Sequence, residues 1–196
     1  MEPIEQTPSH EESLQIITSM IGAARKSFQD SSFYLLLWGW LVFAASVSEY
    51  ILIEFLHYEK HYYVWLLTPV GIIASAVHGY RQDRQEKVKS YIDGYIDQVW
   101  IAFGVGLFII LINTPNMGFA IAYGVITALY GIGTFITGGI LGFRPLKYGG
   151  IACWIISAII FHVNSSAILL LLALSLLLGY IIPGYLLKKE NAEQHV

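Results

Sequence analysis

Charge and cysteine are both scarce in this chain. Only 13% of its 196 residues are Asp, Glu, Lys or Arg, against about 25% in a soluble domain. The formal net charge of -3 leaves no basic surface that would hold a nucleic acid, so we expect no nucleic-acid partner. The single cysteine, Cys153, excludes a disulfide within the chain and any zinc site built from several cysteines. The common motifs of NTPases, zinc proteases, hydrolases and dinucleotide-binding enzymes are also lacking.

The chain is instead rich in long apolar runs. Hydrophobic residues make up 56% of it, the mean hydropathy is +0.59, and 18 glycines are spread through the apolar stretches. This composition is typical of a polytopic membrane protein, in which glycine allows helices to approach closely. A helix of about 20 residues crosses roughly 30 Å of hydrocarbon. Six runs qualify on this basis, and they cover 33–56, 62–80, 95–112, 117–142, 146–163 and 166–187.

These runs predict an all-α fold, a six-transmembrane-helix bundle over 33–187. The third run has the shortest apolar core, 99–112, and is the weakest of the six. A cytoplasmic segment, 1–32, precedes the bundle, and a short cytoplasmic tail, 188–196, follows it. External loops at 57–61, 113–116 and 164–165 are too short to form a separate domain.

The basic residues predict the orientation of the spans. With six spans, ten of the eleven Lys and Arg residues fall on one side of the membrane, and only Lys60 falls on the other. The positive-inside rule makes the basic side cytoplasmic. We therefore expect both termini in the cytoplasm and a bacterial cytoplasmic membrane as the location.

A second helical pattern precedes the first span. Ser9 and Glu12 have the spacing of a capping box. Apolar residues then recur at helical spacing at Leu14, Ile17, Ile21, Ala24 and Phe28. This pattern predicts an amphipathic helix over about 9–28, after which Asp30, Ser31 or Ser32 caps the first span. Such a helix can lie in the cytoplasmic membrane interface or pack against the bundle or a partner chain, and disorder is the remaining alternative.

Glu49 is the residue that a membrane span tolerates least. It lies past the middle of 33–56, roughly 7 Å toward the outer face at 1.5 Å per residue, where a carboxylate costs about 2–3 kcal/mol. It is therefore a proton-coupled or cation site, a protonated glutamate bonded to a tyrosine or serine of a neighbouring helix, or a side chain that reaches the outer surface. His78, at the cytoplasmic end of the second span, and Asp97, at the start of the third, are candidates for a relay.

A metal site at the outer face is a further hypothesis. Glu54, His57 and His61 lie at i, i+3 and i+7, and His162 lies at the same depth on the fifth span. Carboxylate and imidazole groups on one helical stripe can share a divalent metal. Glu-x-x-His occurs here once, whereas a di-iron bundle needs it twice. The alternative is that these groups are solvated beside an aromatic belt of tyrosines, and no other cofactor is expected.

Small residues gather on one face of the fourth run. They are Gly124, Ala128, Gly131, Gly138 and Gly142. Small residues at this spacing allow two helices to touch, which predicts that the fourth span lies centrally in the bundle. The sixth run contains leucines at 169–172 and 176–178 and is expected to face lipid over most of its circumference. Pro183 is expected to kink its cytoplasmic end.

Two adjoining segments resemble a known group of proteins. The residues ESLQIITSMI, 12–21, and AARKSFQDSSFYLLLWGWLVF, 23–43, resemble the opening of an uncharacterised family of small bacterial multi-spanning membrane proteins. The resemblance covers 31 of the 196 residues. It implies a bacterial cytoplasmic membrane and six or so spans, and it implies no activity and no site residue.

Three functions stay open. The favoured one is a non-enzymatic membrane component that docks, senses or regulates a partner, in contact with the lipid bilayer and with another protein or a second copy of itself. The second is a small proton- or cation-coupled transporter or channel that uses Glu49. The third is a metal-dependent membrane enzyme at the outer face, so an enzymatic role is left open but not favoured.

Overall fold

The structure, a computed structural model, describes residues 10–84 and 91–193, and within these ranges it contains helices and turns but no strand. The helices in chain order are α1 (His10–Glu54), α2 (Thr68–Asp83), α3 (Tyr91–Met117), α4 (Phe119–Ile140), α5 (Arg144–Ile160), α6 (Ala167–Leu176) and α7 (Ile182–Glu193). A 3-10 helix, η1 (His61–Leu67), precedes α2, and a π-helical turn, η2 (Leu177–Ile181), joins α6 to α7. The expected all-α fold is therefore confirmed.

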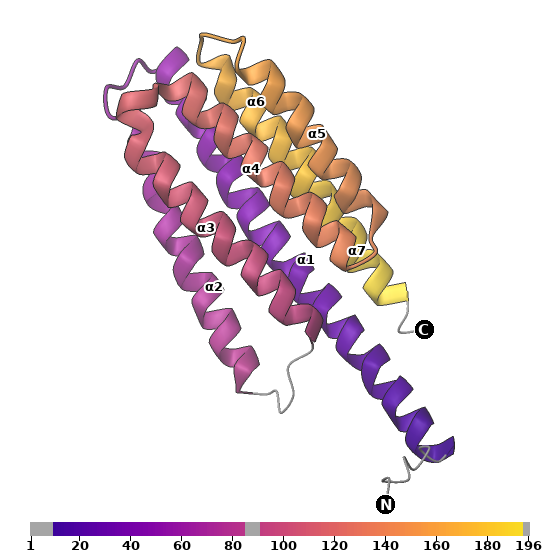
Figure 1. The fold of residues 1–196 in the computed structure, drawn as a ribbon. Helices are drawn as coiled ribbons and strands as arrows, with labels where there is room; N and C mark the ends of the chain where they lie inside the picture. The colour runs from indigo at the N-terminus through magenta and orange to yellow at the C-terminus, as the bar shows by residue number, and fades with distance from the viewer. Residues whose placement is uncertain (1–9, 85–90, 194–196) are drawn as a thin grey trace, which may run out of the picture.

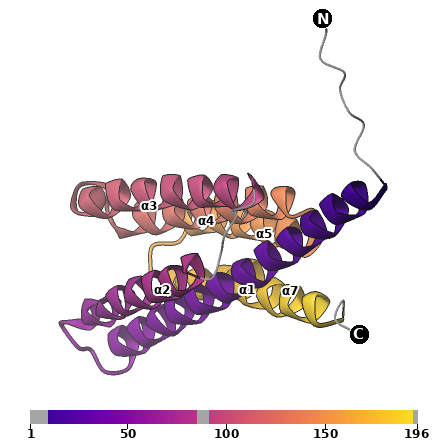
Figure 2. The same cartoon turned by 90° about the horizontal axis from the view of Figure 1, so that it is seen from below.

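The helices form two layers, which Figure 2 shows side by side. One layer contains α3, α4 and α5, and the other contains α2, α1 and the rod formed by α6, η2 and α7. The closest packing lies between α4 and α5 and between α1 and the rod. Leu35 and Val42 of α1 meet Ile126 of α4 and Leu172 and Leu176 of α6 in the core between the layers. In the described ranges, α2 packs only against α1 and η1.

Among the described residues, five helical segments are long and apolar enough to cross a membrane. They are Ser31–Glu54, His61–Arg81, Gly94–Met117, Phe119–Ile140 and Ala167–Glu190. The third predicted span, expected to be the weakest, is among them. Helix α5, which corresponds to the predicted fifth span at 146–163, has 17 residues and falls short of that length.

The first helix is longer than the sequence predicts. The sequence predicts a break between an amphipathic helix at 9–28 and a span that begins at 33. This prediction is wrong, because α1 continues without interruption from His10 to Glu54. Ser31 and Ser32 are buried in the bundle and do not stand at a helix end. Serine inside a helix costs only a fraction of a kcal/mol relative to alanine, so packing against the bundle decides the conformation.

The predicted loop at 113–116 is also helical. Helix α3 runs through it, with Pro115 inside the helix. Directly before the proline, Asn113 and Thr114 donate side-chain hydrogen bonds to the carbonyl oxygens four residues earlier, at 2.8 and 3.0 Å. These bonds add polar contacts to the helix where the proline lacks an N–H donor. Gly118 alone makes the turn to α4 with φ +83°, a left-handed conformation that glycine adopts without strain.

The rod of α6, η2 and α7 is the most deeply buried of the five candidate spans. The expectation that it faces lipid over most of its circumference is therefore wrong. Leucine does not distinguish the two environments, because lipid tails are as apolar as a protein core. The π-helical turn η2 ends directly before Ile182 and Pro183. Proline cannot donate to a carbonyl four residues earlier, and a π-turn is a common way to accommodate that lost bond.

Candidate functional site at Glu49

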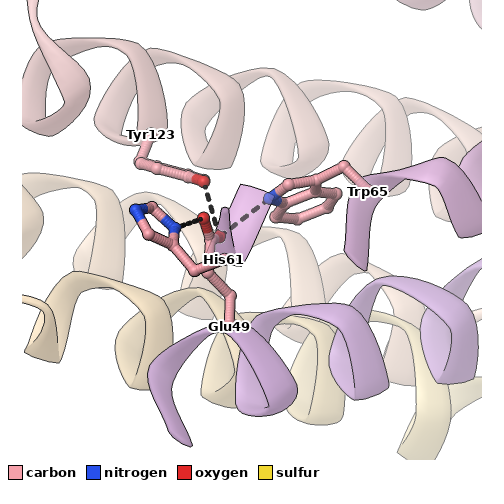
Figure 3. Close-up of polar contacts among 4 residues, drawn as sticks. All are labelled: Glu49, His61, Trp65 and Tyr123. Carbon is pink, nitrogen blue, oxygen red and sulfur yellow. Dashed lines mark hydrogen bonds and ion pairs between the residues drawn. The ribbon is translucent and has the colours of Figure 1, made fainter. Parts of the chain in front are cut away.

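Glu49 lies on the buried side of α1 and is only 3% exposed. Three side chains reach its carboxylate, as Figure 3 shows. Nδ1 of His61 lies 2.8 Å from Oε1, while the indole N–H of Trp65 and the hydroxyl of Tyr123 donate to Oε2 at 2.8 and 3.1 Å. With a proton on Nδ1, both carboxylate oxygens have donors. Glu49 is therefore buried and paired within the protein.

The chain reversal after α1 brings two of these donors back to it. His57 has φ 48°, an uncommon left-handed conformation for a residue other than glycine. After it, η1 packs against α1 and presents His61 and Trp65, four residues apart. At the end of η1, Thr68 donates a side-chain hydrogen bond of 2.7 Å to the carbonyl of Trp65, and Pro69 then occupies the first turn of α2, a position where proline is favourable.

We call Glu49, His61, Trp65 and Tyr123 the Glu49 cluster. It connects the two layers, because α1 and η1 belong to one and α4 to the other. The His61 side chain is 29% exposed while that of Glu49 is 4% exposed, so the imidazole lies between the carboxylate and solvent.

The four predicted metal ligands are not brought together. His61 belongs to the Glu49 cluster, Glu54 accepts a hydrogen bond from the Ser166 hydroxyl, and His57 and His162 are exposed in different loops. Within residues 10–84 and 91–193, no three His, Cys, Asp or Glu side chains gather closely enough to hold an ion. The spacing of i, i+3 and i+7 requires a helix, whereas α1 ends at Glu54.

The two predicted relay residues lie toward the other end of the bundle. His78 is near the end of α2, stacked on Phe33 with ring centroids 3.9 Å apart and in edge contact with Tyr34. Asp97 is near the start of α3 and is exposed. The Glu49 cluster lies at the opposite end of the bundle, where α1 ends and η1 begins (Figure 1). The structure therefore does not bring either residue to Glu49.

The small residues of α4 lie against α5. A Cβ at Gly131 would lie 2.5 Å from the Trp154 indole, and a Cβ at Gly138 would lie 2.8 Å from the backbone nitrogen of Lys147. Gly124 lies in the same way against the ring of Phe161. These three glycines allow the two helices to approach more closely than any larger residue would permit.

The remaining two small residues behave differently. The carbonyl of Ala128 accepts a hydrogen bond of 3.2 Å from the indole N–H of Trp154. Gly142 lies in the turn before α5 with φ +68°, and no atom lies within 4 Å of the position of an added Cβ. Its role is to form the turn, and it makes no helix contact.

A row of hydroxyl groups along α4 has no counterpart among the predicted site residues. Its members recur at steps of four and three residues, at Tyr123, Thr127, Tyr130, Thr134 and Thr137. The last four are buried, and Thr127 and Thr134 donate to carbonyls four residues earlier, at 2.8 and 2.7 Å. The Thr137 hydroxyl is buried without a hydrogen-bond partner. The regular spacing in the sequence was the signal for this row.

The sequence offered a tyrosine of a neighbouring helix as one possible partner of Glu49, and Tyr123 of α4 is such a partner. It identified neither Tyr123 nor Trp65 individually, because both are aromatic residues in apolar runs. The only available signal was that each lies near the predicted outer end of its span, at about the depth of Glu49. Comparison of the chain with family models, curated proteins and solved structures gives no match.

Proposed function

We propose that this chain is an integral protein of the bacterial cytoplasmic membrane with six spans and both termini in the cytoplasm. Helix α5 supplies the sixth span, because it runs antiparallel to α4 and packs against both α4 and the α6–α7 rod (Figure 1). Its 17 residues extend about 25 Å, close to the roughly 30 Å of a hydrocarbon core.

The distribution of basic residues supports this orientation. The ends of α2 and α7 and the start of α5 lie at one end of the bundle, and the turn between α1 and η1, which contains Lys60, lies at the other (Figure 1). The basic residues on those elements are Arg81, Arg84, Arg144, Lys147, Lys188 and Lys189. By the positive-inside rule their end is cytoplasmic, which puts the Glu49 cluster at the outer end.

The function we propose is docking of a cytoplasmic protein through the N-terminal part of α1. One observation carries this proposal. Helix α1 has 45 residues and is therefore about 68 Å long, more than twice the thickness of the hydrocarbon core. Its first part projects beyond the other helices at the cytoplasmic end in both views (Figures 1 and 2).

In the sequence, the apolar stripe of this projecting part is in phase with the residues of α1 that lie on its buried side. Steps of three and four residues connect Leu14, Ile17, Ile21, Ala24 and Phe28 to Ser31, Leu35, Trp38, Val42, Ala45 and Glu49. An interfacial amphipathic helix lies in the membrane plane, whereas this helix continues a span and leaves that plane. An apolar stripe outside the membrane is typical of a helix that docks in a groove of another protein.

The partner on this interpretation is a cytoplasmic protein with an apolar groove for a helix. A second copy fits less well, because the stripe continues the side of α1 that faces its own α6–α7 rod. Two parallel copies that paired through this stripe would bring their bundles into collision.

Photo-crosslinking in intact cells tests the docking function. A photoreactive amino acid at Ile17 or Ile21 lies on the stripe, and one at Ser19 or Lys26 lies on the opposite face of the helix. We expect one cytoplasmic protein to crosslink from the stripe positions only. The Ile21→Asp variant should lose this crosslink from position 17 while inserting normally into the membrane. Crosslinks to lipid or to a second copy from the stripe, or equal crosslinking from both faces, would contradict the proposal.

A proton- or cation-coupled transporter that uses Glu49 is the second candidate. The row of buried hydroxyl groups that begins at Tyr123 favours it, because unpartnered polar groups such as Thr137 are costly in a membrane and often mark ion pathways. Purified protein in proteoliposomes should then conduct protons, sodium or potassium faster than empty liposomes, and Glu49→Gln should abolish the flux. Absence of flux in the wild type would remove this candidate and leave docking in place.

A further inference from the structure

A long groove lies between α3 and α4 on the surface of the bundle. Its volume is about 480 Å³, within the range of sites that bind small molecules. Ala102 of α3 and Gly133 of α4 give it its depth, because neither has a large side chain. The rest of its lining is apolar apart from Gln98 and the hydroxyl of Tyr95.

The groove has the length of one membrane leaflet. It extends along α4 from Leu129 to Ile140, which is about 16 Å at 1.5 Å per residue. Half of a hydrocarbon core of roughly 30 Å is about 15 Å. The groove therefore matches an extended acyl chain that runs from the surface of one leaflet toward the middle of the bilayer.

The cytoplasmic end of the groove is basic. Ile140 ends α4 and is followed by the turn to Arg144, the exposed first residue of α5. The side chain of Lys147 reaches over α4, since its Cε lies 4.0 Å from the position of a Cβ on Gly139. The nearby acid, Asp97, lies on the other side of α3 from Val99, which lines the groove.

The geometry points to a binding site for one anionic phospholipid of the cytoplasmic leaflet, with an acyl chain in the α3–α4 groove and its phosphate beside Lys147 and Arg144. Basic residues between membrane helices on the cytoplasmic side recognise anionic headgroups. Tyr95 and Gln98 lie at the same end and can donate hydrogen bonds to the glycerol and ester oxygens. This inference rests on the membrane placement proposed above.

Native mass spectrometry of the purified protein tests the site. The probes are phosphatidylglycerol and phosphatidylcholine with identical oleoyl chains, added to the protein in detergent. We expect one phosphatidylglycerol to remain bound and phosphatidylcholine to bind more weakly. Lys147→Gln or Arg144→Gln should each reduce the preference about five-fold, and the double variant about thirty-fold, as expected for contacts of about 1 kcal/mol each. Lys188→Gln, an exposed lysine at the same end, is the matched control.

A second pair of variants tests the groove itself. Ala102→Trp should fill it and abolish retention of both lipids, whereas Ala76→Trp, at an exposed alanine of α2, should bind as the wild type does. Thermal unfolding without added lipid checks that both variants fold. Wild-type binding by Ala102→Trp would overturn the acyl-chain site, and an unchanged preference in the double variant would overturn the headgroup site. Equal binding of soluble glycerol phosphate would also overturn the proposal.

This test can fail independently of the docking function. The Ile21→Asp variant, which should lose the protein crosslink, should still retain one phosphatidylglycerol. A protein that docks its partner but retains no lipid would therefore refute the groove alone, and one that retains lipid but never docks would refute the docking function alone.

Discussion

At the scale of single residues, the Glu49 carboxylate gathers three donors from two other segments of the chain. Each donor depends on it in turn, because the indole N–H of Trp65 and the hydroxyl of Tyr123 are partly buried and both donate to the same carboxylate oxygen. A buried donor that loses its acceptor costs about 1–3 kcal/mol. The cluster therefore fixes the C-terminal end of α1 to η1 and α4.

Substitutions at Glu49 should separate hydrogen bonding from charge. Glutamine can accept from Trp65 and Tyr123 with its oxygen and donate to an unprotonated Nδ1 of His61 with its amide. We expect the unfolding free energy of Glu49→Gln to lie within about 1 kcal/mol of the wild-type value. Glu49→Leu leaves the donors without an acceptor and should cost about 2–5 kcal/mol. Unfolding in detergent measures both, and an equal loss in the two variants would show that the charge matters and the hydrogen bonds do not.

The bond between the layers can be tested by itself. Tyr123→Phe removes the hydroxyl that donates to Glu49 across 3.1 Å and should cost about 1 kcal/mol. In the Glu49→Leu background the same change should cost almost nothing, because the acceptor is already gone. A double-mutant cycle on unfolding free energies measures this coupling. Additive effects of the two substitutions would mean that the hydroxyl does not bond to Glu49.

Sequence reasoning identified Glu49 but not the residues around it. A lone carboxylate in an apolar run is visible from hydropathy, because its cost depends on depth alone. Its partners depend on how the helices are rotated and which of them are neighbours, and one sequence contains little of that information. His61 was therefore assigned to a metal stripe on a helix that the structure ends at Glu54.

At the scale of the helical elements, proline and glycine determine where helical geometry changes and where helices come into close contact. Gly149 of α5 crosses η2 so closely that a Cβ on it would lie 2.9 Å from the Cα of Gly179. Pro183 follows the same π-turn by two residues. The sequence predicted a change of geometry near Pro183 but not that α5 passes over the adjoining turn.

Two adjacent glycines of α4 provide a matched test of the packing with α5. A Cβ at Gly138 would lie 2.8 Å from backbone and side-chain atoms of α5, whereas at Gly139 the nearest atom lies 4.0 Å away. Gly138→Ala should therefore overpack the contact and cost about 1–3 kcal/mol. Gly139→Ala should stabilise the helix by up to about 1 kcal/mol, because alanine loses less backbone entropy than glycine. Both effects are measured by thermal unfolding, and equal effects would place Gly138 on an open face of α4.

At the scale of the whole molecule, apolar runs predicted most of the helices but not their burial. The boundaries of α4 agree with the prediction to within two residues at each end, because turns with glycine on both sides interrupt the hydrophobic pattern. The order of burial could not be predicted, since leucine-rich helices look alike in lipid and in a core. The α6–α7 rod is the most buried of the five candidate spans and α3 is the least buried, although both are strongly apolar.

The placement of α5 decides on which side of the membrane the C-terminus lies. Six spans put both termini on one side, whereas five put them on opposite sides. Single cysteines at Glu59, Asn164, Arg84 and Lys189 can report this, because all four positions are exposed. The native cysteine, Cys153, is buried, so it should contribute little labelling of its own.

An impermeant maleimide applied to intact cells should label Glu59→Cys and Asn164→Cys. Arg84→Cys and Lys189→Cys should react only after the membrane is permeabilised, because the proposed topology places the basic ends of α2 and α7 in the cytoplasm. If Asn164→Cys also required permeabilisation while Lys189→Cys were labelled from outside, α5 would not cross the membrane. The basic end of α7 would then lie outside, and the lipid-binding charges of Arg144 and Lys147 would no longer share a leaflet with it.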